Sequence, residues 1–131
     1  MTFEMNSRTT SSPPRAAILL AAHRVDGRLL DSYAKLQAEA SGEGDVFLLL
    51  ETEDGLRPAS LPPEVRCFPF SVEGLNGLGF EPLACYIVPG SNHFPLWLFR
   101  CSRPDYAFYW NVEYDVRFCG HWGRDFFSFF R

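Results

Sequence analysis

Several familiar signatures are missing from this chain of 131 residues. No stretch reaches the roughly 20 consecutive apolar residues that a membrane-spanning helix needs, so no membrane span is expected. Lys and Arg form no cluster and the net charge is -4, which argues against nucleic-acid binding through the phosphate backbone. The GxGxxG fingerprint, the P-loop and the GxSxG elbow are also absent. Dinucleotide-binding Rossmann proteins, P-loop proteins and hydrolases with that elbow are therefore disfavoured.

Cysteine chemistry is poorly supported as well. The four cysteines form no CxxC pair and no Cys/His pair at zinc-finger spacing; they are Cys67, Cys85, Cys101 and Cys119. A structural zinc site is therefore not expected. Reduced, buried thiols in a cytoplasmic protein are the favoured interpretation, while disulfide pairing of these widely spaced cysteines stays open.

The length fits one globular domain that can bury a hydrophobic core, and the composition, with 47% hydrophobic and 21% charged residues, is ordinary for such a domain. Met1–Arg15 is polar, rich in Ser and Thr, and is predicted to be a disordered leader. The apolar run Ala16–Ala22 is at the short limit for the core of a signal peptide and is followed directly by His23 and Arg24, so it is interpreted as a first core strand. Residues 16–131 then form a single α/β domain.

Apolar runs alternate with helical patterns along the rest of the chain. A helix is predicted over residues 28–40, where apolar side chains recur at helical spacing. The further expected elements are a strand over Asp45–Glu51, a short strand over Val65–Phe70, an irregular Gly-rich stretch over Ser71–Pro82, a helix over Ser91–Arg100 capped by Ser91, and an aromatic strand from Tyr106. The order β-α-β-β-α-β predicts an α/β fold with a mainly parallel sheet flanked by helices.

The aromatic segment, residues 106–118, contains the strongest candidate site. Its apolar start predicts a fully buried strand, and it ends with Glu113 and Asp115 two residues apart. In an extended chain these two side chains share a face. Paired carboxylates can hold Mg²⁺ or Mn²⁺, which would bridge the oxygens of a diphosphate and neutralise charge on a leaving group. The alternative is a pair of rim carboxylates bonded to Arg117 or Arg100.

Other candidate residues lie in turns that follow predicted strands. His23, Arg24 and Arg28 follow the first strand, and the two guanidiniums could hold phosphate oxygens. His121 could complete a metal shell. An acidic turn ends the second strand and could accept hydrogen bonds from a nucleoside; its residues are Glu51, Glu53 and Asp54. For each of these residues the alternative is an ordinary solvated or hydrogen-bonded surface position.

The residues around the acidic pair carry a family resemblance. Residues 104–116, an aromatic strand that ends in two acids, resemble the "DxD" region of GT-A-type glycosyltransferases, which begin with a β-α-β unit. Residues 110–122 are also similar to a little-characterised group of glycosyltransferase-like proteins with the pattern W-x-x-E-x-D-V-x-[FY]-x-G-x-W. The resemblance extends over residues 16–130 and corresponds to the Rossmann-like, nucleotide-binding half of such enzymes.

This resemblance implies metal-dependent glycosyl transfer from a nucleotide-diphosphate sugar, a UDP-sugar in the first place, to an unknown acceptor. Asp115 would be the ligand of Mn²⁺ or Mg²⁺, and Glu113 would reach the metal through water or bind the sugar nucleotide. The turn that contains Glu51, Glu53 and Asp54 corresponds to the place where the family reads the nucleobase. Complete enzymes of this type have a second, acceptor-binding half, so the resemblance implies a truncated or minimal donor-binding unit.

The end of the chain favours a different class of function. Four phenylalanines must be buried or must form a sticky patch, and these are Phe126, Phe127, Phe129 and Phe130. If they are exposed, the domain is a non-catalytic interaction module that docks on a partner or on a second copy of itself. A small hydrolase with Glu113 and Asp115 as an acid/base pair is a third interpretation, which no nucleophile supports. Metal-dependent nucleotide binding separates the first two interpretations.

Overall fold

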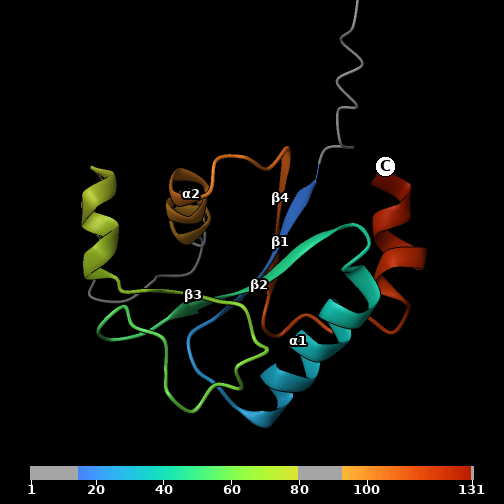
Figure 1. The fold of residues 1–131 in the computed structure, drawn as a ribbon, viewed down its shortest axis with the longest axis horizontal. Helices are drawn as coiled ribbons and strands as arrows, with labels where there is room; N and C mark the ends of the chain where they lie inside the picture. The colour runs from blue at the N-terminus through green and yellow to red at the C-terminus, as the bar shows by residue number, and fades with distance from the viewer. Residues whose placement is uncertain (1–14, 80–92, 131) are drawn as a thin grey trace, which may run out of the picture.

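The computed structural model describes residues 15–79 and 93–130 (Figure 1). Three predictions concern residues outside these ranges: the leader up to residue 14, the helix cap Ser91 and the state of Cys85. Residues 80–82 of the predicted irregular stretch also lie outside them. None of the helices in these two ranges combines the length and the apolar composition of a membrane span.

Four strands form one sheet in which all neighbours run parallel. They are β1 (Ala16–Ala22), β2 (Gly44–Glu51), β3 (Cys67–Phe70) and β4 (Phe108–Glu113). Their order across the sheet is β3-β2-β1-β4. The chain therefore moves outward from β1 through β2 to β3, and then returns to the opposite side of β1 as β4. The predicted parallel α/β sheet is confirmed.

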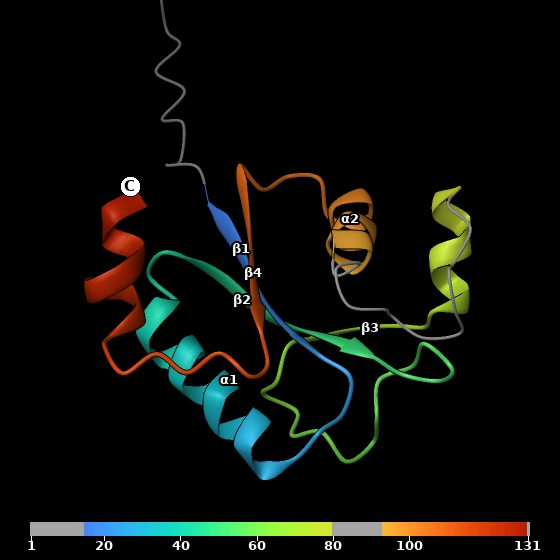
Figure 2. The same cartoon turned by 180° about the vertical axis from the view of Figure 1, so that it is seen from behind.

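Helices cover both faces of this sheet and make a three-layer, Rossmann-like arrangement. One face packs against α1 (Gly27–Ala40), a turn of π-helix, η2 (Trp122–Phe126), and a 3₁₀ turn, η3 (Phe127–Phe130). The other face packs against α2 (His93–Ser102) and the 3₁₀ helix η1 (Glu73–Leu78). Figures 1 and 2 show α1 and the C-terminal segment on one side and α2 and η1 on the other.

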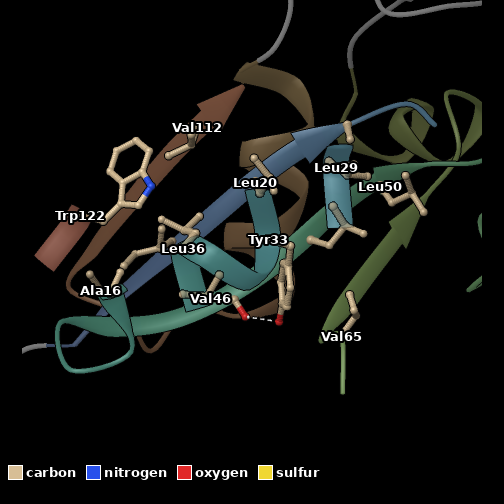
Figure 3. Close-up of a cluster of buried hydrophobic side chains, with 14 of the residues drawn as sticks. Ala16, Leu20, Leu29, Tyr33, Leu36, Val46, Leu50, Val65, Val112 and Trp122 are labelled. Carbon is tan, nitrogen blue, oxygen red and sulfur yellow. Dashed lines mark hydrogen bonds between the residues drawn. The ribbon is translucent and has the colours of Figure 1, made fainter. Parts of the chain in front are cut away.

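The two helical layers explain why β1 and β2 are continuously apolar, because a strand covered on both faces has no solvent side. Ile18, Leu20, Val46 and Leu48 belong to the same core cluster as Leu36 of α1. Figure 3 shows Leu20, Val46 and Leu36 within this cluster. On the other face, alternate residues pack against Phe99 of α2; these residues are Ala17, Leu19, Phe47 and Leu49. Both core clusters come from strands that the sequence pattern predicted.

Helix α1 begins one residue earlier than predicted. Asp26 caps it, because its carboxylate accepts a hydrogen bond from the Leu29 N–H at 2.9 Å. The helix ends at Ala40 as predicted, and its buried residues Leu29, Tyr33, Leu36 and Ala40 follow helical spacing. This cap fixes the path of the chain as it leaves the end of β1.

The prediction of a fully buried aromatic strand is wrong. β4 begins at Phe108 instead of Tyr106, and it is an edge strand of the described sheet, paired with β1. Phe108 is consequently 55% exposed, and Trp110 is only half-buried. The strand also ends at Glu113, because the Val116 N–H donates to the Glu113 carbonyl at 3.0 Å and closes a turn. An extended backbone therefore does not hold both carboxylates on one face.

Two further expectations are corrected. The described part of the predicted irregular stretch contains η1, a short 3₁₀ helix. Cys67, Cys101 and Cys119 are free, but Cys101 and Cys119 are exposed rather than buried. Burial raises the pKa of Cys67, which is half-buried.

The phenylalanines at the end of the chain divide into two pairs. Phe127 is buried, and Phe126 packs against the rings of Trp110 and Trp122 at centroid distances of 5.6 Å. Phe129 and Phe130 are 80% and 56% exposed. The predicted apolar patch is therefore limited to the last two phenylalanines, because the first two complete the core beside α1.

Candidate functional site

The strand order reverses between β1 and β4, and in open parallel sheets ligands bind at such a point, outside the carboxyl ends of the strands. His23 directly follows β1, and Tyr114 directly follows β4. The two rings meet edge to face with centroids 5.0 Å apart, and the Tyr114 N–H donates to the Ala21 carbonyl at 2.9 Å. Two segments far apart in the sequence are thus joined at one place, here called the switch-point site.

The acidic side of the switch-point site consists of Glu113, the last residue of β4, and Asp115, in the turn that follows it. Glu113 pairs with Ala21 in the sheet, and both Glu113 and Asp115 are exposed. Arg117 donates to the carbonyl oxygen of Tyr114 at 3.1 Å, and the Asp115 carboxylate forms no hydrogen bond or ion pair with the described residues. The Asp115 oxygens are therefore accessible at the carboxyl edge of the sheet.

These two carboxylates fit a hard divalent cation in the identity of their donor atoms, because Mg²⁺ and Mn²⁺ prefer oxygen ligands. Across residues 15–79 and 93–130, no three His, Cys, Asp or Glu side chains form a group that could hold a metal ion. A cation held by one or both of these carboxylates would have several coordination positions left for water and for phosphate oxygens. The chemistry of the pair thus fits a cation that arrives with a diphosphate better than a fully protein-bound ion.

The basic side comes from the connection between β1 and α1. Arg24 Nε lies 3.7 Å from an Asp26 carboxylate oxygen, and these side chains are 71% and 45% exposed. Arg28 is exposed in the first turn of α1. The amino end of a helix carries a partial positive charge, which adds to that of these guanidiniums, although the Asp26 cap offsets part of it. Phosphate oxygens are the ligands that this connection suits.

The acidic turn after β2 lies on the other side of β1 from β4. Glu51 ends β2 and is half-buried, and Glu53 is exposed. Asp54 is used within the turn, because its carboxylate accepts hydrogen bonds from the Leu56 N–H at 3.0 Å and the Thr52 hydroxyl at 3.4 Å. Glu51 and Glu53 therefore stay candidates for contact with a ligand, whereas Asp54 has a structural role.

His121 lies between Gly120 and Trp122, which both form hydrogen bonds with α1. Its Nδ1 accepts a hydrogen bond from the Arg124 N–H at 3.0 Å and caps η2. The next residue, Trp122, donates its N–H to Glu39 of α1 at 2.9 Å. The structure therefore does not assemble His121 with Glu113 and Asp115 into one metal shell.

Tyr114 is the residue of this site that sequence reasoning missed. Its signal was its place directly after an apolar strand, where the chain reaches the rim of the sheet. Tyr114 is 39% exposed, so one part of its ring contacts His23 and another faces solvent.

Comparison with known protein families matches the C-terminal part of the chain. Residues 79–130 match a family described as Protein of unknown function (DUF3405). The matched part includes α2, β4 and the C-terminal turns, and therefore Glu113, Tyr114 and Asp115, but not β1, β2 or β3. No curated protein and no solved structure matches the chain.

Proposed function

We propose that this chain binds a nucleotide-diphosphate sugar together with Mn²⁺ or Mg²⁺ at the switch-point site and transfers the sugar to an acceptor. One observation carries the proposal. The reversal of strand order at β1 brings the end of β4, where Glu113 and Asp115 are exposed, into contact with His23, the first residue of the connection after β1 that also carries Arg24 and Arg28. A cation with a diphosphate needs such neighbours, because the carboxylates hold the cation and the guanidiniums hold phosphate oxygens.

Each side of the site has a defined part in this proposal. Asp115 holds the cation directly, and Glu113 holds it through water or binds the sugar nucleotide. A cation held by these residues would supply positive charge against the departing nucleoside diphosphate, which takes the electron pair of its bond to the sugar. Arg24 and Arg28 bind and orient the phosphate oxygens from the α1 side.

The aromatic contact between His23 and Tyr114 holds the turn after β4 against the end of β1. Glu51 and Glu53 lie next along the carboxyl edge, beyond β1, and are the side chains available to accept hydrogen bonds from the nucleoside. The resemblance to the nucleotide-binding half of GT-A glycosyltransferases supports the same assignment. The matched family is described as having no known function, so the match neither supports nor opposes this proposal.

The test is a calorimetric titration of UDP and UDP-sugars into the chain, with and without Mn²⁺. We expect binding that requires Mn²⁺ and that weakens at least tenfold in Asp115→Ala, because the variant loses a direct ligand of the cation. Asp105→Ala is the matched control, since Asp105 is also exposed but precedes β4 at the opposite edge of the sheet. Release of UDP from a bound UDP-sugar in the presence of acceptors then tests transfer.

Equal nucleotide binding by the wild type and Asp115→Ala would overturn the assignment of Asp115. Absence of nucleotide binding by the folded wild type would overturn the proposed function. The exposure of Phe129 and Phe130 would then favour the interaction module, which sedimentation at increasing protein concentration would detect as association.

A further inference from the structure

A second group of charged side chains lies at the edge of the sheet where the strands begin. Its members come from residues at or just before the start of each of the four strands. Figure 1 shows that β1 and β4 start at this edge. We call it the amino-edge cluster; its members are Arg15 before β1, Asp45 at the start of β2, Arg66 before β3, and Arg103 and Tyr106 before β4. It lies about 20 Å from the carboxyl edge, because a parallel strand rises roughly 3.3 Å per residue.

Asp45 lies at the centre of the amino-edge cluster. One of its oxygens accepts a hydrogen bond from Arg15 at 2.7 Å and lies 3.6 Å from Arg66 Nη1. The other oxygen accepts a hydrogen bond from the Tyr106 hydroxyl at 2.7 Å. Burial raises the pKa of Asp45, but these hydrogen bonds outweigh burial, so its pKa is lowered and it stays ionised. The carboxylate thus holds the surrounding donors in place.

The ring of Phe47 anchors two of the guanidiniums. The Cζ atoms of Arg66 and Arg103 lie 5.2 Å and 5.7 Å from its centroid. The ring itself is buried in the core at 3% exposure, so its position is fixed by packing. Stacking of this kind holds a guanidinium plane while leaving its N–H groups free to bind elsewhere.

The groups that make these contacts carry an excess of positive charge. Three are guanidiniums and one is a carboxylate. Burial and the hydrogen bond to Asp45 raise the pKa of Tyr106 to about 12, so its hydroxyl adds no negative charge at neutral pH. The Arg15 and Arg66 side chains are 55% and 51% exposed, and Arg103 is exposed as well. Their unused N–H donors are therefore accessible to a ligand.

We infer that the amino-edge cluster binds the phosphate group of a small phosphate monoester. The three guanidiniums outnumber the one carboxylate that they surround, which favours an anion with more than one negative charge, such as a monoester dianion. Its three terminal oxygens can also accept hydrogen bonds from more than one guanidinium at a time. A diester has one charge and two free oxygens, so it matches the cluster less well. The inference does not depend on the proposed function, because it uses no residue of the switch-point site.

The test is a titration of the ¹⁵N-labelled whole chain with inorganic phosphate and with phenyl phosphate, followed by two-dimensional NMR. EDTA removes divalent cations, and the ionic strength is held constant at pH 7.5 so that screening does not change. We expect saturable shifts of amide signals around the amino-edge cluster with both ligands. Arg66→Gln and Arg103→Gln should each weaken binding about tenfold, because each removes charge-assisted hydrogen bonds.

Arg100→Gln is the matched control, because the Arg100 guanidinium also lies over an aromatic ring, 5.4 Å from the centroid of Trp97, but outside the cluster. The same spectra establish that each variant is folded. Shifts that do not saturate, or equal weakening by all three substitutions, would overturn the site. Dimethyl phosphate is expected to bind at least tenfold more weakly, and equal binding of this diester would overturn the assignment to a monoester.

Discussion

Tyr33 illustrates how one buried hydroxyl connects three segments of the chain. It lies on the apolar face of α1 at 4% exposure. Its hydroxyl donates to the Val46 carbonyl of β2 at 3.3 Å and accepts from the Arg66 N–H at 3.0 Å (Figure 3 shows the first bond). Helical spacing predicted that Tyr33 faces the core, but not that its hydroxyl forms hydrogen bonds with the backbone of Val46 and Arg66.

Replacing Tyr33 by Phe keeps the ring and removes both hydrogen bonds. We expect a loss of about 1–2 kcal/mol in the free energy of unfolding, because the two backbone groups lose their partner in a buried setting. Urea denaturation followed by circular dichroism measures this difference. Tyr114→Phe is the control, since that side chain is partly exposed and should change stability by less than about 0.5 kcal/mol. Equal stability of Tyr33→Phe and wild type would contradict the assigned role.

At the scale of elements, polar contacts join the C-terminal turns to α1. Lys35 donates to the Glu39 carboxylate at 2.7 Å and to the Gly120 carbonyl at 2.6 Å. The same Glu39 oxygen accepts from the Trp122 N–H. The hydrogen bonds from Lys35 and from Trp122 lower the pKa of Glu39 below its ordinary value of 4.5. Glu39 therefore holds η2 on α1 in its ionised form.

This pKa shift predicts a pH dependence of stability. Because the pKa of Glu39 is lower in the folded state, its contribution is fully present above about pH 4.5 and is lost as the pH falls through the lower, folded-state pKa. At pH 7, Glu39→Gln should be less stable than wild type by about 1–2 kcal/mol. We expect this difference in the free energy of unfolding between wild type and Glu39→Gln to decrease when urea denaturation is repeated at pH 4 and pH 3. Glu64→Gln, at an exposed position, is the control, and a gap independent of pH would refute the linkage.

The close approach of η2 to α1 also explains Gly123. A Cβ atom at this position would collide with the Glu39 carbonyl oxygen. Gly123→Ala should therefore push η2 away from α1 and lower the free energy of unfolding by about 2 kcal/mol. Gly42→Ala provides the comparison, because a Cβ atom there meets nothing within 4 Å. Thermal unfolding of the two variants should separate them, and similar midpoints would argue against tight docking of η2.

At the scale of the whole molecule, local apolar patterns were enough to predict β1, α1 and β2. Ala16–Ala22 was predicted with its observed bounds, because a short, unbroken apolar run between polar residues is typical of a buried strand. The edge position of β4 was not predictable in this way. Its aromatic content indicates a strand but not its place in the sheet, which depends on pairing between distant segments.

The candidate site was predictable to a similar extent. The sequence indicated that the candidate residues would lie where strands end. The structure brings the turn after β1 beside the turn after β4. The helix cap made by His121 and the amino-edge cluster were not foreseen. Both depend on side chains that meet only when α1 and the four strands have assembled.

The central place of β1 has a consequence for how the chain acquires its structure. β1 pairs with β2 across a single helix, but its other side pairs with β4, where Ala16 lies opposite Phe108. During synthesis on the ribosome, that second side of β1 offers unpaired backbone groups until residues 108–113 have emerged. Contacts between such distant segments slow folding, so this step is expected to limit its rate. A nascent chain halted before β4 would expose an apolar strand to its neighbours, and is the species that chaperones would have to protect.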